Sequence, residues 1–169
     1  MSSLKHLIMF SGGAGSYVAA KRVIEKHGTD GVALLFADTR IEDEDLYRFL
    51  NDAQAKLGAP LIRVMDGRTP WGVMRDRKII GNSRIDPCSM ILKRKLLDKW
   101  RDILGTPHET TVYVGIDWTE MHRLKPLQER CLPWRYEAPM TQKPFLTKTD
   151  MIQIIKEDGI QPPRLYALG

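Results

Sequence analysis

The sequence predicts an α/β fold around a mostly parallel, five-stranded sheet. Runs of apolar residues with the length of buried strands alternate with segments whose apolar residues recur at helical spacing. Strand, helix, strand, helix and strand follow one another over residues 7–65, an order typical of parallel strands joined by right-handed crossovers. A glycine-rich turn at 11–16 joins the first strand directly to the first helix. A length of 169 residues suits one domain with its own core, so we expect a single domain over 1–169.

Three strands and two helices are expected in the first half of the chain. The strands are continuous apolar runs, and the second of them is apolar enough to be buried on both faces. Each helix ends at a glycine before the next strand, and four acidic residues precede the second helix, where they favour a helix N-terminus. The predicted strands are 7–10, 31–36 and 61–65, and the predicted helices are 17–26 and 46–57.

The second half of the chain is less regular. A Thr-Pro-Trp sequence at 69–71 opens a short helix, and 81–87 is expected to form a loop. In the helix that follows this loop, the apolar side chains are expected to face the core and the basic ones to face outward. Further strands are predicted at 110–114 and 135–138, and further helices at 89–101, 120–130 and 147–157.

The turn at 11–16 reads Ser-Gly-Gly-Ala-Gly-Ser and predicts a phosphate-binding site. A strand that enters a helix through small residues leaves the first helical N–H groups free to bind an anion. Glycines allow the backbone to approach that anion, and serines add hydroxyl donors. No lysine stands where a Walker loop requires one, and only the first half of a dinucleotide fingerprint is present. The expected phosphate ligands are Ser11, Gly12, Gly13, Gly15 and Ser16.

The turn resembles the Ser-Gly-Gly-x-Asp-Ser loop of the PP-loop superfamily, which includes the N-type ATP pyrophosphatases and the phosphoadenosine phosphosulfate (PAPS) reductases. Three further segments, 36–39, 88–97 and 115–123, are similar to segments of the reductase branch and follow in the same order. The likeness is greatest to PAPS-reductase-like proteins of phages and mobile elements. This resemblance implies a Rossmann-like, three-layer fold of the HUP type. It also implies ATP or a related adenine nucleotide, with Mg²⁺ as an accompanying ion, at the carboxyl ends of the strands.

The resemblance implies roles for residues outside the turn as well. Lys93 and Arg94 match a basic pair that compensates phosphate charge. Asp38 either accepts hydrogen bonds from the nucleotide or caps the next helix, and Arg123 either reaches a phosphate or pairs with Glu120. The further nucleotide-binding candidates are Asp38, Gly115 and Arg123, and the catalytic candidates are Asp38, Asp117, Glu120 and Cys88.

Two departures from the family pattern bear on the reaction. Gly15 stands where the loop normally has its aspartate, so the role of that acid is missing or passes to Asp38, Asp117 or Glu120. Residues 162–169 lack the Glu-Cys-Gly-x-His tail of the reductases, which predicts that this polypeptide alone does not complete sulfonucleotide reduction. Longer relatives continue with a cysteine-bearing segment, so we expect a domain that is C-terminally shortened relative to them.

Basic residues gather in the middle of the chain. The formal net charge is +5, and between Asp66 and Arg101 there are ten basic residues and four acidic ones. The block from Arg68 to Arg101 either binds phosphate, including that of tRNA or DNA, or forms a solvated helical face. No apolar run is long enough to cross a bilayer, and the two distant cysteines lack a metal-binding spacing. We therefore expect a cytoplasmic protein with no membrane partner and no metal site of its own.

Three functions follow from these observations. The favoured one is an enzyme that cleaves ATP between its α- and β-phosphates and adenylates an unknown acceptor, or that performs sulfonucleotide chemistry. The second is a nucleotide- or nucleic-acid-binding module without catalysis, which Gly15 and the basic block favour. The third is a sulfur-transfer enzyme acting on a nucleic acid. In that case Cys88 at a helix start would carry the persulfide, whereas a buried cysteine at this position would be inert.

Overall fold

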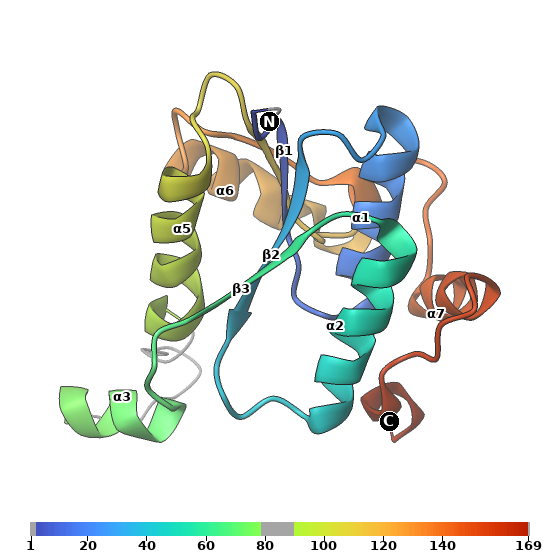
Figure 1. Ribbon diagram of the computed structural model, residues 1–169. Coiled ribbons are helices and arrows are strands. Elements are labelled where there is room, and N and C mark those ends of the chain that lie inside the picture. Colours follow the sequence, from blue (N-terminus) through green and yellow to red (C-terminus); the bar gives the residue numbers. More distant parts are fainter. Residues whose placement is uncertain (1–2, 79–89, 169) are drawn as a thin grey trace.

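The computed structural model describes residues 3–78 and 90–168 and confirms the α/β class (Figure 1). The described residues form one five-stranded sheet of order β3-β2-β1-β4-β5, in which every neighbouring pair is parallel. The strands are β1 (His6–Met9), β2 (Val32–Asp38), β3 (Leu61–Met65), β4 (Thr111–Tyr113) and β5 (Arg135–Glu137). All five lie within two residues of the positions that the apolar runs predict.

The helices also follow the predicted order. The α-helices are α1 (Ala14–His27), α2 (Glu44–Leu57), α3 (Pro70–Arg77), α5 (Leu96–Leu104), α6 (Leu124–Arg130) and α7 (Lys148–Glu157). The π-helix η1 (Met90–Lys95) leads into α5, and the described residues also contain three 3₁₀ segments: η2 (Trp118–Arg123), η3 (Pro139–Thr141) and η4 (Arg164–Ala167). The predicted loop at 81–87 lies outside the described residues.

Helix α1 begins at Ala14, three residues earlier than the sequence predicts. The last three residues of the glycine turn are therefore the first turn of the helix, because small residues fit a helix start as well as a loop. The segment predicted as one helix over 120–130 is instead the 3₁₀ helix η2 followed by α6, and η2 is itself kinked at Glu120, which has a non-helical φ of −111°.

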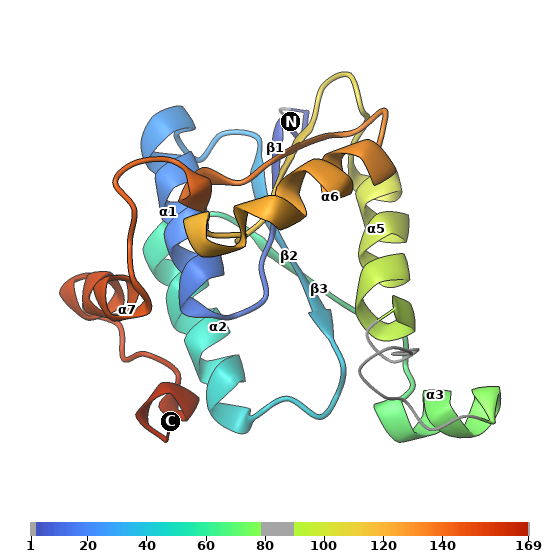
Figure 2. The same cartoon turned by 180° about the vertical axis from the view of Figure 1, so that it is seen from behind.

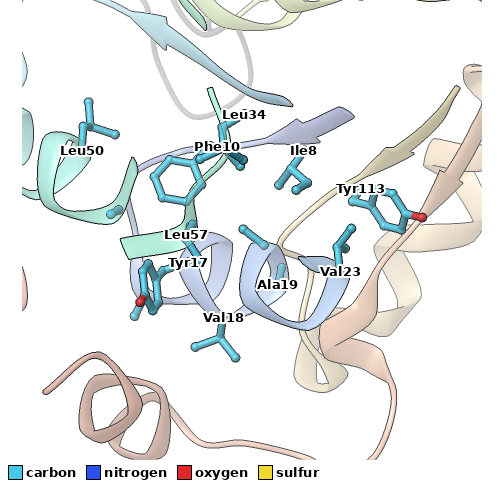
Figure 3. Packing of buried hydrophobic residues seen from close by; sticks show 14 of the residues in the cluster. Ile8, Phe10, Tyr17, Val18, Ala19, Val23, Leu34, Leu50, Leu57 and Tyr113 are labelled. Atoms are coloured by element: carbon cyan, nitrogen blue, oxygen red, sulfur yellow. The ribbon is translucent and has the colours of Figure 1, made fainter. Parts of the chain in front are cut away.

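Helices cover both faces of the sheet and make three layers. Ile8 of β1 packs with buried residues of α1, α2 and α7, whereas its neighbour Leu7 packs on the opposite face against α5. Helix α6 covers that second face beside α5, through Leu127 against Val112 of β4. Figures 1 and 2 show this division from the front and from behind, and Figure 3 shows the closely packed layer between the sheet and α1. The Rossmann-like three-layer arrangement is thus confirmed.

The strand order determines where a ligand site is expected. From β1 the chain moves outward to β2 and β3, and it then returns to the other side of β1 to form β4 and β5. Doubly wound sheets bind ligands where the strand order reverses, at the carboxyl ends of the two central strands. Here that switch point lies between the ends of β1 and β4, where the glycine turn and Gly115 follow the two strands.

In the part of the chain that the structure describes, no helix has both the length and the apolar character required to span a bilayer.

Candidate functional site

The glycine turn leaves backbone donors open at the start of α1. Gly13 is the N-cap of α1 and, as a glycine, has no side chain of its own to cap the helix. Among the residues that the structure describes, no acceptor receives a hydrogen bond from the N–H groups of Gly15 and Ser16. The N-terminus of a helix also carries about half a positive charge from the aligned peptide dipoles. The start of α1 is therefore suited to bind an anion.

Gly12 gives the turn its shape. Its φ is +83°, a conformation that L residues rarely adopt, and a Cβ atom there would lie 2.5 Å from Cδ1 of Leu46 in α2. The positive φ and the close approach both explain a glycine at this position. The backbone can then bend from β1 into α1 while staying in contact with α2.

The two serines of the turn differ in their availability. Ser16 is buried, with its hydroxyl donating to the carbonyl oxygen of Gly13 at 2.9 Å. Ser11 is exposed, and its hydroxyl donates to Ser16 Oγ at 3.3 Å. Ser16 thus stabilises the turn, whereas Ser11 is accessible to a ligand.

The structure brings Gly115 against the first turn of α1. A Cβ atom on Gly115 would lie 3.2 Å from the backbone nitrogen of Ser16, and one on Gly15 would lie 3.4 Å from the carbonyl oxygen of Gly115. Two glycines therefore let the loop after β4 and the glycine turn meet directly. This contact joins two of the sequence-predicted binding segments at the switch point.

A pocket opens beside Ser11, at the ends of β1 and β2. Its empty volume is about 330 Å³, and its lining combines apolar side chains with Lys93. Lys93 is half-exposed, and its ammonium lies 3.6 Å from a carboxylate oxygen of Glu42. The lining residues are Met9, Phe10, Ser11, Leu35, Phe36, Ala37, Lys93 and Leu97. The pocket thus offers an apolar surface together with two polar groups, the Ser11 hydroxyl and the Lys93 ammonium.

Asp38 is buried at the end of β2 and is engaged by three donors. Its carboxylate accepts hydrogen bonds from the Arg40 backbone N–H at 2.7 Å, the Tyr47 hydroxyl at 2.8 Å and Arg63 Nε at 3.1 Å. Burial, together with the hydrogen bond to Asp38, raises the pKa of Tyr47. The N-cap of α2 is Asp43, so the capping alternative for Asp38 is not what the structure shows. Asp38 instead holds the turn that follows β2.

The segment after Gly115 makes its own local contacts. Asp117 caps η2 by accepting from the backbone N–H of Thr119 at 2.8 Å. Arg123 donates to Glu120 at 2.6 Å, and both side chains are more than two-fifths exposed. Of the two alternatives for Arg123, the structure shows the pair with Glu120.

The basic block does not form one continuous charged face. Arg68 pairs with Asp66 and Asp76, and Arg101 is buried, where it stacks over Trp134 and donates to the Tyr136 hydroxyl at 2.9 Å. The prediction that the basic residues of 89–101 face outward is therefore wrong for Arg101, because the rings of Trp134 and Tyr136 and the hydroxyl of Tyr136 make a buried site for its guanidinium. Lys93, Arg94 and Lys95 are exposed on η1, as predicted.

Two further features complete the description of the predicted site. Cys88, the proposed persulfide carrier, lies outside the described residues. Over 3–78 and 90–168, no group of three or more His, Cys, Asp or Glu side chains is arranged to hold a metal ion.

One residue at the turn is not predicted from the sequence. The hydroxyl of Tyr166 in η4 accepts a hydrogen bond of 2.8 Å from the backbone N–H of Ala14. A Cβ atom on Gly13 would lie 3.2 Å from the same hydroxyl oxygen. No local pattern marks Tyr166, because its role depends on a contact across 152 residues of chain.

The strand order and the position of the glycine turn define the fold class. An all-parallel sheet of order 3-2-1-4-5 with a glycine turn at its switch point is a Rossmann-like α/β fold. No protein-family model and no curated protein matches the sequence.

Solved structures share this fold. The PAPS reductase of Candida auris, determined as a phosphate complex, superposes with a TM-score of 0.63 at 16% identity, over 96% of this chain and 77% of the reductase. An NH₃-dependent NAD synthetase from Campylobacter jejuni, determined with a nitrate ion, gives a TM-score of 0.57 at 13% identity, over 93% of this chain and 65% of the synthetase. This chain therefore spans less than two thirds of the synthetase. The predicted resemblance to PP-loop proteins is confirmed in the fold.

Proposed function

We propose that this chain binds an adenine nucleotide, ATP or a close relative, with its phosphates at the first turn of α1. The observation that carries the proposal is the pair of N–H groups at Gly15 and Ser16, which point from the helix start without an acceptor among the described residues. They lie at the switch point of the sheet, beside the exposed hydroxyl of Ser11. Both solved neighbours were determined with an oxyanion, phosphate in one and nitrate in the other.

The pocket beside Ser11 supports the choice of an adenine nucleotide. Apolar side chains from β1, β2 and α5 line it, and such a lining favours an aromatic base over a second charged group. Ser11 and Lys93 stand on its polar side, where a sugar or phosphate would leave the pocket toward the turn. The same nucleotide can thus occupy the pocket and the turn.

The favoured reaction is adenylation. An acceptor attacks the α-phosphorus of ATP, the bond to the oxygen bridging the α- and β-phosphates breaks, and pyrophosphate leaves with the bonding electrons. The N–H groups of the turn and the ammonium of Lys93 stabilise the negative charge that develops on the leaving group. Asp38 already accepts from three donors, so we do not assign it to the chemistry step.

Binding without cleavage is the second candidate, and one observation favours it. Gly15 occupies the position of the loop acid, and it lies against the carbonyl of Gly115, so the turn itself brings no carboxylate to the nucleotide. A module of this kind would respond to nucleotide concentration rather than consume the nucleotide.

Calorimetry and a product assay separate these candidates. We expect ATP to bind more tightly than GTP, because an apolar lining disfavours burial of the polar carbonyl group of guanine, which adenine lacks. Incubation with Mg²⁺ and ATP labelled at the α- or the γ-phosphate, alone and with tRNA or DNA, should then give labelled AMP, free or on the acceptor, or labelled pyrophosphate if the chain adenylates an acceptor. Binding without either product supports the module, whereas a folded protein that binds no adenine nucleotide contradicts the whole proposal.

A further inference from the structure

The hydroxyl of Tyr166 lies where a phosphate oxygen would bind. Of the first three N–H groups of α1, the one at Ala14 donates to this hydroxyl at 2.8 Å, whereas those of Gly15 and Ser16 have no acceptor among the described residues. A phosphate at a helix start uses the same set of donors. The phenol oxygen and a phosphate oxygen therefore compete for the N–H of Ala14.

The segment that carries Tyr166 is held against the start of α2 by ion pairs and hydrogen bonds. Arg164 pairs with Asp43 at 2.8 Å, and its backbone N–H donates to Asp45 at 2.7 Å. Arg48 of α2 donates to the carbonyl oxygens of Gln161 at 2.7 Å and Pro162 at 3.2 Å. Figures 1 and 2 both show the end of the chain beside the start of α2.

These ion pairs and hydrogen bonds lie at the surface and can break. The Arg164 side chain is 60% exposed, so its ion pair with Asp43 is only weakly stabilising and is screened by salt. The neighbouring Leu165 and Leu168 are exposed as well. Tyr166 itself is partly buried against the edge of the main core cluster, so η4 gives up this peripheral packing as well when it leaves the turn.

Lys148 contacts the ring of Tyr166 and is free to pair with a bound phosphate once that ring has left. The ammonium of Lys148, at the start of α7, lies 4.8 Å from the centre of the Tyr166 ring. With the ring gone, this exposed ammonium loses its aromatic partner next to a site that has gained anionic phosphates. The exchange favours the open state only when the nucleotide is present.

We propose that η4 is a built-in competitor of the nucleotide, with Tyr166 occupying the phosphate turn until the nucleotide displaces it. The inference rests on the proposed function, because it assigns a regulation to the same site. The apparent affinity for the nucleotide then equals the affinity of the open state multiplied by the fraction of molecules in which η4 is open. Loss of one hydrogen bond of ordinary strength therefore changes the apparent Kd by about two- to tenfold.

The test compares nucleotide affinity in three variants. Tyr166→Phe removes only the hydroxyl, and Arg164→Gln removes the ion pair with Asp43. Arg130→Gln, on the exposed end of α6, is the matched control for loss of one positive charge. Calorimetric titration with ATP and with inorganic pyrophosphate gives each Kd, and thermal unfolding shows that each variant is folded.

Competition predicts that Tyr166→Phe and Arg164→Gln both bind ATP about two- to tenfold more tightly than the wild type, with Arg130→Gln unchanged. The Arg164 variant is the sharper arm, because loss of a positive charge near an anion site would otherwise weaken binding. Equal or weaker binding by both variants overturns the competition and leaves the proposed function intact. If no folded variant binds ATP, including the wild type, the proposed function itself fails.

Discussion

Gly115 and Ser16 meet backbone to backbone, since a Cβ atom on Gly115 would lie only 3.2 Å from the Ser16 nitrogen. Gly115 lies in the loop after β4, and Ser16 lies in the first turn of α1, which follows β1, so their contact makes a single surface at the switch point of the sheet. Gly115 approaches the N–H group of Ser16, which is one of the open donors of the proposed site. The position of this N–H group therefore depends on the absence of a side chain at residue 115.

Gly115→Ala should weaken nucleotide binding more than it lowers stability. The added methyl group must push the first turn of α1 by a few tenths of an ångström, because its nearest neighbours are backbone atoms. We expect a three- to tenfold higher Kd for ATP, equivalent to about 1 kcal/mol. Gly72→Ala is the matched control, since a Cβ there would meet its nearest neighbour, Arg68 Cβ, at an ordinary 3.5 Å. Equal Kd values for the two variants would show that Gly115 does not set the position of the donors.

Gly12→Ala should instead destabilise the fold. With φ at +83°, an alanine would incur strain of about 1–2 kcal/mol, and Leu46 would have to move away from the new Cβ atom. Urea unfolding followed by circular dichroism measures the free energy of unfolding, again with Gly72→Ala as the control. An unchanged free energy of unfolding would mean that the turn can adopt another conformation.

Lys93→Gln should raise the Kd for ATP about three- to tenfold, because the ammonium lines the pocket beside Ser11. Lys95→Gln removes the same charge from the same π-helix, but Lys95 is not among the residues that line the pocket. Calorimetry at low and at moderate salt separates a local contact from a general effect of net charge. A similar loss of affinity in both variants would remove Lys93 from the site.

Asp158 should make stability depend on pH in the acid range. It accepts hydrogen bonds from Tyr17 at 2.7 Å and from Lys21 at 2.5 Å. Burial acts to raise the pKa of Asp158, but the bonds from Lys21 and Tyr17 outweigh burial and lower that pKa below its usual value. The stabilisation is therefore complete above the unfolded pKa of about 4 and is lost as the pH falls through the lower folded pKa.

Asp158→Asn should accordingly lower the free energy of unfolding by about 1–2 kcal/mol at pH 7. Urea unfolding of wild type and variant should give values that converge as the pH falls below about 4. A constant difference between pH 7 and pH 3 would show that the charge of Asp158 does not contribute.

Local patterns in the sequence were sufficient to predict the elements of this fold. The apolar runs specified the strands because buried parallel strands have no polar face, and the glycines after α1 and α2 marked the ends of those helices. The glycine turn between β1 and α1 was predicted for a similar reason. Its strand, small residues and helix are contiguous in the chain.

Contacts between residues far apart in the chain leave no local pattern from which they can be predicted. Arg101 looks like a solvent-facing charge at its helical position, and only the tertiary structure places Trp134 and Tyr136 around it. Likewise, nothing near Asp38 in the sequence indicates that Arg63 will approach it from β3. The contact between Tyr166 and Ala14 belongs to the same kind.

Titration of ¹⁵N-labelled protein with ATP tests the central claim most directly, because backbone amide resonances report on the donors themselves. Phosphate binding at the start of α1 predicts that the Gly15 and Ser16 resonances shift and saturate with the Kd found by calorimetry. Amides at the far end of α1, near Gly28, should stay in place. A folded protein whose Gly15 and Ser16 resonances do not move at saturating ATP would contradict the account.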